Sequence, residues 1–290
     1  MSSNQPNWEQ SVKLRYRFLI AMLSTCACLV LVADAWATET PDLHIGLAPD
    51  TPRAPAPSLL TAALAPVPGT PETFAKITPS LSPNRLGAKA SLTVTIDYTG
   101  GAFGVPAAVT RSLLRLPAGL ALDIPHLSSC SGARLLARGP GGCPVQSAIG
   151  RGRGLVKAHE GTETIAENLT LWVFLGPPDN LQPTFEIFAQ GYTPVDEAKV
   201  FDGSVVPSGP PYGEALELSL PAIPTLALEP DVSVSTLSLT IGPTRIHGAR
   251  TDNSIVLPTS CPHGGFPFAA EFTYADGSSG SALATTPCPR

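Results

Sequence analysis

The sequence has 290 residues, of which 43% are apolar and only 14% are charged, and its formal net charge is −5. Its 32 prolines and 26 glycines exclude a fold of many long helices, because proline lacks a backbone donor and clashes with the preceding helical turn. The acidic balance disfavours non-specific nucleic-acid binding, which needs a basic surface. We therefore expect an all-β protein with a sizeable core and no nucleic-acid partner.

The first 37 residues have the parts of a secretory signal peptide. Lys13, Arg15 and Arg17 precede an uncharged apolar run at 18–32, and Ala35-Trp36-Ala37 provides the small residues of a cleavage site. The run is shorter than the roughly 20 residues that a membrane span needs. We therefore expect export to the cell surface or the extracellular space, with Thr38 as the first mature residue. A retained, membrane-anchoring N-terminal helix is the alternative.

Residues 38–76 are rich in proline and alanine and show no apolar period. Such a stretch favours extended polyproline II and acts as a spacer, and it is equally typical of a disordered exported tail. The predicted organisation is a signal peptide at 1–37, a disordered linker at 38–76 and a folded domain at 77–290.

Four cysteines follow the signal peptide, namely Cys130, Cys143, Cys261 and Cys288. An even number of cysteines in an exported chain indicates disulfides. No CxxC pair occurs, which argues against a zinc site. Of the three possible connectivities we predict the local one, Cys130–Cys143 with Cys261–Cys288, with at most one short helix, at 132–137, inside the first loop.

From residue 77 onward, apolar residues alternate with polar ones at a period of two, which predicts β-strands. In 232–241 the apolar parity changes after Val234, so we expect a β-bulge near Ser235 and Thr236. The strands are expected at 92–98, 110–116, 149–157, 168–175, 183–189, 216–220, 232–241, 254–257 and 266–274, with 281–286 closing a last hairpin. They predict one antiparallel β-sandwich, jelly-roll or immunoglobulin-like. Two smaller sandwiches that divide near residue 180 are the alternative.

The segment 149–155 contains three glycines at a period of two. No helix-forming segment follows it, which argues against a phosphate-binding loop. We predict an antiparallel hairpin between 149–157 and 168–175, with Trp172 and Phe174 lying over the face that Gly152 and Gly154 leave bare.

Charge is unevenly distributed, with a net of +7 over residues 85–157 and −11 over residues 158–231. Neighbouring strands of opposite charge would explain this difference. The alternative is an acidic face that binds cations or a basic partner.

No constellation of residues points to catalysis. The five histidines, His44, His126, His159, His247 and His263, are scattered, and no GxSxG motif occurs. Glu186, Glu214 and Glu217 are the candidates for a glycosidase pair, although Glu217 alternates with leucines as an outward strand residue does. We predict no catalytic, cofactor-binding or metal-binding residues, and therefore no cofactor.

Two short motifs carry a resemblance. Leu116-Pro117-Ala118-Gly119-Leu120 precedes a run with Cys143-Pro144, Ser147, Ile149-Gly150 and Gly152. This arrangement resembles a group of uncharacterised exported all-β proteins of high-GC Gram-positive bacteria. The resemblance implies a bacterial origin and a β-sandwich, and it implies no activity or ligand.

The sequence as a whole predicts a non-catalytic exported or cell-surface β-sandwich protein with a binding or structural role. Its partner would be an unknown cell-envelope or extracellular ligand, and membrane contact would occur only if the N-terminal segment is retained. A secreted hydrolase with dispersed catalytic residues is the alternative.

Overall fold

The structure is a computed structural model that describes residues 72–125, 128–193, 196–221, 223, 231–246 and 248–289. The predicted signal peptide and the predicted linker up to residue 71 lie outside these residues. The described part is almost entirely β, as the alternation predicted. Its strands are β1 (Thr73–Ser82), β2 (Lys89–Gly100), β3 (Val109–Pro117), β4 (Ala121–Asp123), β5 (Ala148–Glu160), β6 (Glu163–Leu175), β7 (Thr184–Gln190), β8 (Ala198–Pro207), β9 (Tyr212–Ser219), β10 (Ser233–Ile241), β11 (Arg245–Ile246), β12 (Ala249–Arg250), β13 (Ser254–Val256), β14 (Phe266–Tyr274) and β15 (Ser279–Thr286).

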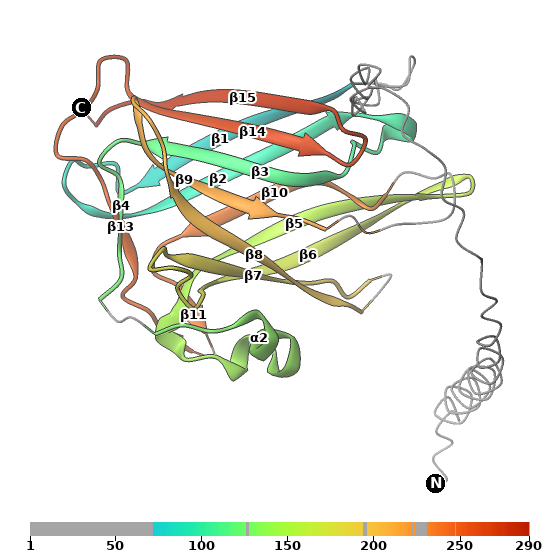
Figure 1. The fold of residues 1–290 in the computed structure, drawn as a ribbon, viewed down its shortest axis with the longest axis horizontal. Helices are drawn as coiled ribbons and strands as arrows, with labels where there is room; N and C mark the ends of the chain where they lie inside the picture. Colours follow the sequence, from blue (N-terminus) through green and yellow to red (C-terminus); the bar gives the residue numbers. More distant parts are fainter. Residues whose placement is uncertain are drawn as a thin grey trace, which may run out of the picture. The chain divides into compact units, whose positions relative to one another are not determined.

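Thirteen of the strands form one antiparallel sheet (Figure 1). Its order is β15-β14-β3-β9-β8-β7-β6-β5-β10-β2-β13-β4, and β1 pairs with β2 off this path. Strands from before residue 180 are interleaved in this order with strands from after it, since β3 pairs with β9 and β2 pairs with β10. The sheet therefore joins the segments that a two-sandwich arrangement would have separated.

The sheet folds back on itself, so that its two ends face each other across a shared core. Figure 1 shows β1 running beside β15, and the Thr286 hydroxyl donates to the Pro79 carbonyl oxygen at 3.3 Å. Tyr98 of β2 packs edge-on against Phe272 of β14, with ring centroids 5.2 Å apart. This arrangement confirms the predicted all-β, sandwich-like fold.

The first strand starts at Thr73, four residues before the predicted start of the domain. Along β1 only every fourth residue is buried, at Thr73, Ile77 and Leu81. A strand with so few inward apolar residues lacks the period-two signal on which the prediction depended.

The predicted bulge in β10 is confirmed. The register of β10 against β5 shifts between Val234 and Thr236, and the Ser235 hydroxyl donates to the Leu155 carbonyl oxygen at 3.2 Å. The extra residue returns Leu237 and Leu239 to the inward face that Val234 occupies.

The predicted hairpin of β5 and β6 forms, but its face assignment was wrong. The two-residue turn Gly161-Thr162 pairs even-numbered residues of β5 with odd-numbered residues of β6, so Gly152 lies opposite Leu171. Trp172 and Phe174 therefore lie on the opposite face from Gly152 and Gly154.

The space above the glycines is taken by side chains of β10 instead. A Cβ atom added at Gly152 would lie 2.6 Å from Leu239 Cδ2, and one at Gly150 would lie 2.9 Å from Ile241 Cδ1. The glycines thus let two branched side chains of the neighbouring strand approach the backbone of β5 closely.

The outer face of β5–β8 is covered by a small third layer. Its helix α2 (Gly132–Arg138) begins at Ser131, whose hydroxyl accepts from the Arg134 N–H, and it lies against β7 and β8 (Figure 1). Leu135 of this helix packs on Phe174 and Phe188. Trp172, Phe174 and Phe188 therefore lie in the cluster under α2, whereas Phe185 of β7 faces the interior. The described chain also contains the short 3₁₀ turns η1 (Ala102–Gly104), η2 (Pro140–Gly142) and η3 (Val145–Ser147).

Both predicted disulfides are present. Cys130 and Cys143 flank α2 with their Cα atoms 5.6 Å apart. Cys261 and Cys288 close the β14–β15 hairpin with a Cα separation of 6.0 Å. These separations lie in the usual range, and such bonds are compatible with an extracellular location. Over the described ranges, no helix is both long enough and apolar enough to span a membrane.

Candidate functional site

The space between the two layers is not filled along its whole length. Toward the β5–β6 turn it contains a cavity of about 480 Å³. The room comes from small residues at inward positions, namely Ala108, Ser112, Ala158, Ala189 and Gly191. This volume lies within the range of roughly 300–1,000 Å³ that is typical of small-molecule sites. We call it the interior cavity.

The walls of the interior cavity are apolar. They are formed mainly by branched and aromatic side chains from eight strands, including Val156, Leu169, Leu171, Phe201, Leu218 and Val234. The strand period places them there, because alternate residues of each strand point into the space between the layers. The cavity therefore suits a ligand with little polar surface.

The two ends of the interior cavity differ in their exposure to solvent. At the deep end, Leu171 is 3% exposed and Ile187 is 4% exposed. At the outer end, Val156, Ile165 and Leu169 are only half-buried. Contiguous apolar surface left in contact with water is a common feature of ligand and partner sites.

Charged residues line only the outer end, which we call the mouth and define as Glu160, Glu167, Glu197 and Lys199. Lys199 Nζ lies 2.5 Å from Glu197 Oε1, so these two charges balance. The Thr193 N–H donates to Glu167 Oε1 at 3.1 Å. In the described part of the chain, Glu160 and Glu167 form no ion pair, and the mouth keeps a net charge of −2.

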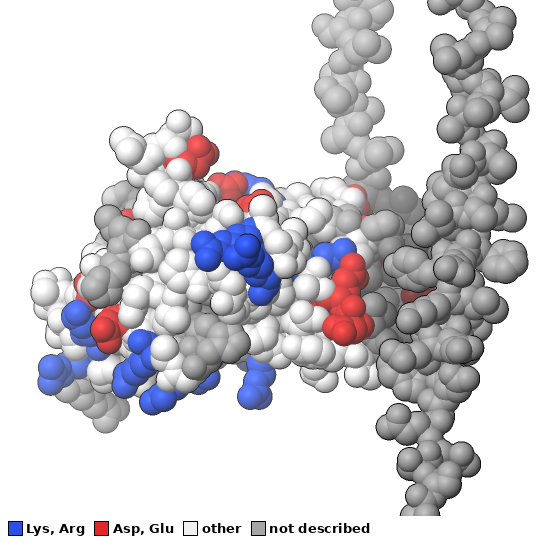
Figure 2. Space-filling model, turned by 90° about the horizontal axis from the view of Figure 1, so that it is seen from below, with Lys and Arg blue, Asp and Glu red and all other residues white. Residues whose placement is uncertain are grey.

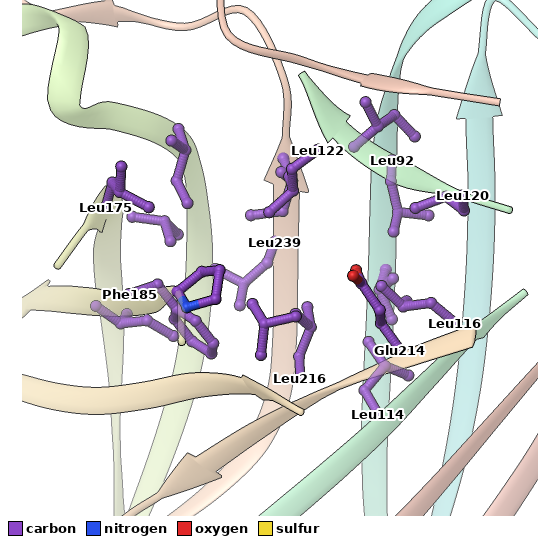
Figure 3. A pocket seen from close by; sticks show the side chains of 18 of the residues that line it. Leu92, Leu114, Leu116, Leu120, Leu122, Leu175, Phe185, Glu214, Leu216 and Leu239 are labelled. Carbon is purple, nitrogen blue, oxygen red and sulfur yellow. The ribbon is translucent and has the colours of Figure 1, made fainter. Parts of the chain in front are cut away.

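A smaller apolar compartment of about 80 Å³ continues the interior at the other end of the sheet (Figure 3). It shares Ile187 and Leu237 with the interior cavity. Figure 3 shows the Glu214 carboxylate pointing in among Leu116, Leu216 and Leu239. The two cavities therefore border each other inside the sandwich, with Glu214 beside the smaller one and the mouth at the outer end of the larger one.

The motifs that carry the family resemblance contribute to this smaller compartment. Leu116, Leu120 and Ile149 all line it. Gly119 has φ +81° and forms the turn between β3 and β4, where a side chain would be strained. These motif residues thus have an evident role in packing and turn formation.

The three carboxylates considered for a glycosidase pair do not share a site. Glu214 borders the smaller compartment but is exposed, whereas Glu217 lies on the outer face and accepts from Arg111 Nε at 2.6 Å. Glu186 lies on the outer face of β7, under α2. The sheet therefore separates Glu214 from the other two, while Glu186 is buried under α2 and the Glu217 carboxylate is engaged by Arg111.

Glu186 is the unusual carboxyl group among them. It is 7% exposed, lies directly opposite Asp202 in the β7–β8 register, and its Oε2 atom has no hydrogen-bond partner among the described residues. Burial, followed by the nearby Asp202 carboxyl, raises the pKa of Glu186 to about 8, against a smaller opposing effect of the Gly132 N–H. Glu186 is therefore protonated at neutral pH.

The histidines do not gather around a nucleophile or a metal site in the described residues. His159 is buried, stacks on Phe103 with ring centroids 4.0 Å apart, and lies 3.3 Å from the Thr164 hydroxyl. His263 is exposed, while His44, His126 and His247 lie outside the described residues. Within the described ranges, no group of three metal-ligating side chains occurs.

Basic residues of β3 form ion pairs with acidic residues of the two strands beside it. Arg111 and Arg115 of β3 pair with Glu217 of β9 and Glu271 of β14, at 2.6 and 2.8 Å. Figure 2 shows small separate groups of both signs on one face, among a mostly uncharged surface. Of these pairs, Arg111–Glu217 joins the basic range 85–157 to the acidic range 158–231, as complementary charges on adjacent strands would. The mouth is the exception, because its acidic residues point inward.

Comparisons with known protein families, with curated proteins and with solved structures find no match to this chain.

Sequence reasoning did not predict the interior cavity. Alternation shows which side chains face inward, but the unfilled volume depends on how far apart the layers lie. One signal was available, since Glu160, Glu167 and Lys199 occupy the inward positions of strands that are otherwise apolar on that face.

Proposed function

We propose that the protein is a non-catalytic binding protein, exported or held at the cell surface, that takes a small apolar ligand into the interior cavity. The observation that carries the proposal is the cavity of about 480 Å³, with apolar walls and with charges confined to its outer end. Binding sites for small apolar molecules combine a concave apolar surface with a few polar groups in this way.

The energetics favour an elongated ligand. Each methylene group removed from water contributes about 0.8 kcal/mol. Association costs roughly 4–15 kcal/mol in lost freedom of motion, so a short apolar molecule would bind weakly. A long alkyl chain that reaches from the mouth to Leu171 and Ile187 would bury enough methylene groups to exceed this cost.

The N-terminal sequence and the cysteines support export. Residues 1–37 have the three parts of a signal peptide, and the two disulfides suit an oxidising compartment. An extracellular protein that encloses an apolar molecule would carry it through water, where the free molecule is poorly soluble.

A pair of alanines in one hairpin offers a matched test. Ala158 of β5 lines the interior cavity, whereas Ala166 of β6 is exposed on the opposite face. Tryptophan at position 158 would fill part of the cavity, and tryptophan at position 166 would extend into solvent. The two variants therefore add the same side chain to opposite faces of one hairpin.

The measurement is a titration of the full chain with N-phenyl-1-naphthylamine, a neutral apolar fluorescent probe. We expect saturable binding, a loss of affinity of at least about tenfold in Ala158→Trp, and no change in Ala166→Trp. Circular dichroism would check that both variants keep the β fold. Equal affinity in the two folded variants, or no saturable binding to the unmodified protein, would overturn the proposal.

A further inference from the structure

We propose that the ligand of the interior cavity is a single-chain amphiphile whose head group carries a positive charge. This inference rests on the proposed function and adds the chemistry of the head group. It is drawn from the direction, the partners and the charge of the residues that form the mouth.

The strand register points both free carboxylates into the space that a ligand would enter. Glu160 follows Val156 and Ala158 on the inward face of β5, and Glu167 lies between Ile165 and Leu169 on the inward face of β6. Both belong to the outer part of the cavity wall. A ligand whose chain occupies the apolar deep end would therefore place its head group beside them.

The one cation of the mouth is already engaged. Lys199 lies on the inward face of β8, and its Nζ atom is 2.5 Å from Glu197 Oε1. An anionic head group would have to compete with Glu197 for this lysine, and it would also face Glu160 and Glu167. Among the residues that the structure describes, the mouth therefore provides no free positive charge for a carboxylate or phosphate.

Glu167 is held in place by the backbone. The Thr193 N–H donates to its Oε1 atom at 3.1 Å, and Gly191 leaves room for the carboxylate, since a Cβ atom there would lie 2.7 Å from Glu167 Cδ. A carboxylate held in this way is preorganised to bind a cation, because its side chain loses little further conformational entropy on binding. Glu160 is exposed at the end of β5 and completes the negative surface.

The expected preference is moderate, because the mouth is open to water. Two unit charges about 4 Å apart interact by about 1 kcal/mol in water and by more beside a protein surface. Two carboxylates acting together correspond to an affinity difference of at least about tenfold between a cationic and an anionic head group.

The test compares three ligands with the same chain and different heads, namely dodecylamine, dodecanol and dodecanoate. Each would displace N-phenyl-1-naphthylamine from the full chain at neutral pH and low ionic strength. We expect the amine to bind most tightly, then the alcohol, then the carboxylate. The amine should exceed the carboxylate by at least about tenfold, and added salt should reduce this ratio.

Variants assign the preference to the mouth. In the double variant Glu160→Gln with Glu167→Gln, we expect the ratio of amine to carboxylate affinity to fall to within about threefold, while dodecanol binds as before. Glu271→Gln is the matched control, since Glu271 is exposed on β14 and pairs with Arg115. It should leave the ratio unchanged.

The outcomes separate the inference from the proposed function. Equal binding of all three ligands, tighter binding of the carboxylate, or an unchanged ratio in the double variant would overturn the inference alone. A failure of all three ligands and of the neutral probe to bind would overturn both.

Discussion

The two halves of the interior have the same strand pattern and different contents. Around β2, β3, β14 and β15, the inward residues include Phe266, Phe268 and Phe272, all at most 2% exposed. Around β5–β8, inward residues such as Ala158 and Ala189 are small and apolar neighbours such as Leu169 are half-buried, and Ser112 of β3 borders the interior cavity from the other half. Aromatic side chains fill the first half, whereas small side chains leave the second half open.

The comparison indicates that the first half stabilises the fold and that the second half is available for a ligand. Protein interiors are close-packed, and an apolar cavity as large as the interior cavity is costly unless an occupant fills it.

The strongest test of the division compares two truncations. Phe268→Ala should lower the free energy of unfolding by about 3–5 kcal/mol, because a fully buried ring leaves a void. Leu169→Ala should cost about 1 kcal/mol, since this side chain already borders the interior cavity. Guanidinium unfolding under non-reducing conditions measures both. Equal costs would show that the two halves are packed alike.

The second prediction concerns the disulfide Cys261–Cys288, which closes the β14–β15 hairpin in the half filled by aromatic side chains. The double variant Cys261→Ser with Cys288→Ser should lose about 3 kcal/mol of stability, because the bond closes a loop over a sequence separation of 27 residues. Binding of N-phenyl-1-naphthylamine by the folded variant should be unchanged, since the bond lies outside the interior cavity. If the variant were fully folded but no longer bound the probe, the disulfide region would also determine the shape of the interior cavity.

The third prediction uses the buried carboxyl under α2. Because the pKa of Glu186 is raised from 4.5 to about 8 on folding, the folded state holds a proton that the unfolded chain releases. This group therefore contributes stability that is fully present below about pH 4.5 and is lost as the pH rises through about 8. Glu186→Gln should flatten this decline.

Between about pH 4.5 and pH 8 we expect the free energy of unfolding to fall by about 1–2 kcal/mol. This figure is kept small because Asp202, beside Glu186, is exposed and water screens its charge. Urea unfolding of the unmodified protein and of the glutamine variant at several pH values measures it. A decline of the same size in both proteins would assign the pH dependence to other groups.

The smallest expected effect concerns the exposed ion pairs on β3. A double-mutant cycle on Arg115 and Glu271, with alanine at each position, should give a coupling of about 0.2–1 kcal/mol that decreases in salt. A coupling above about 2 kcal/mol would mean that surface charge, besides core packing, stabilises the filled half.

Sequence reasoning was most successful where a local pattern determines local geometry. The parity change after Val234 predicted the bulge, and the local pairing of Cys130 with Cys143 was predicted together with a loop that holds at most one short helix. It failed for Trp172 and Phe174 because the face that they occupy depends on the length of the Gly161-Thr162 turn. A shift of one residue in register turns every side chain of a strand to the other face.

The candidate site was less predictable because it depends on volume. Ala158 and Ala189 are ordinary small core residues in the sequence, and only the spacing of the layers shows that no large side chain fills the room beside them. The inward position of Glu167 follows from the Gly161-Thr162 turn, which also places Trp172 and Phe174 on the outer face. Attention to that turn would have placed a carboxylate inside the sandwich.

The most direct test of the cavity is a crystal structure of the protein soaked with 12-bromododecan-1-ol. Anomalous scattering would locate the bromine at the tail of the chain. Binding in the interior cavity predicts a single bromine beside Leu171, Ile187 and Leu218 at the deep end. Bromine only on the outer surface, with ordered water between Leu169 and Phe201, would contradict the proposed binding function.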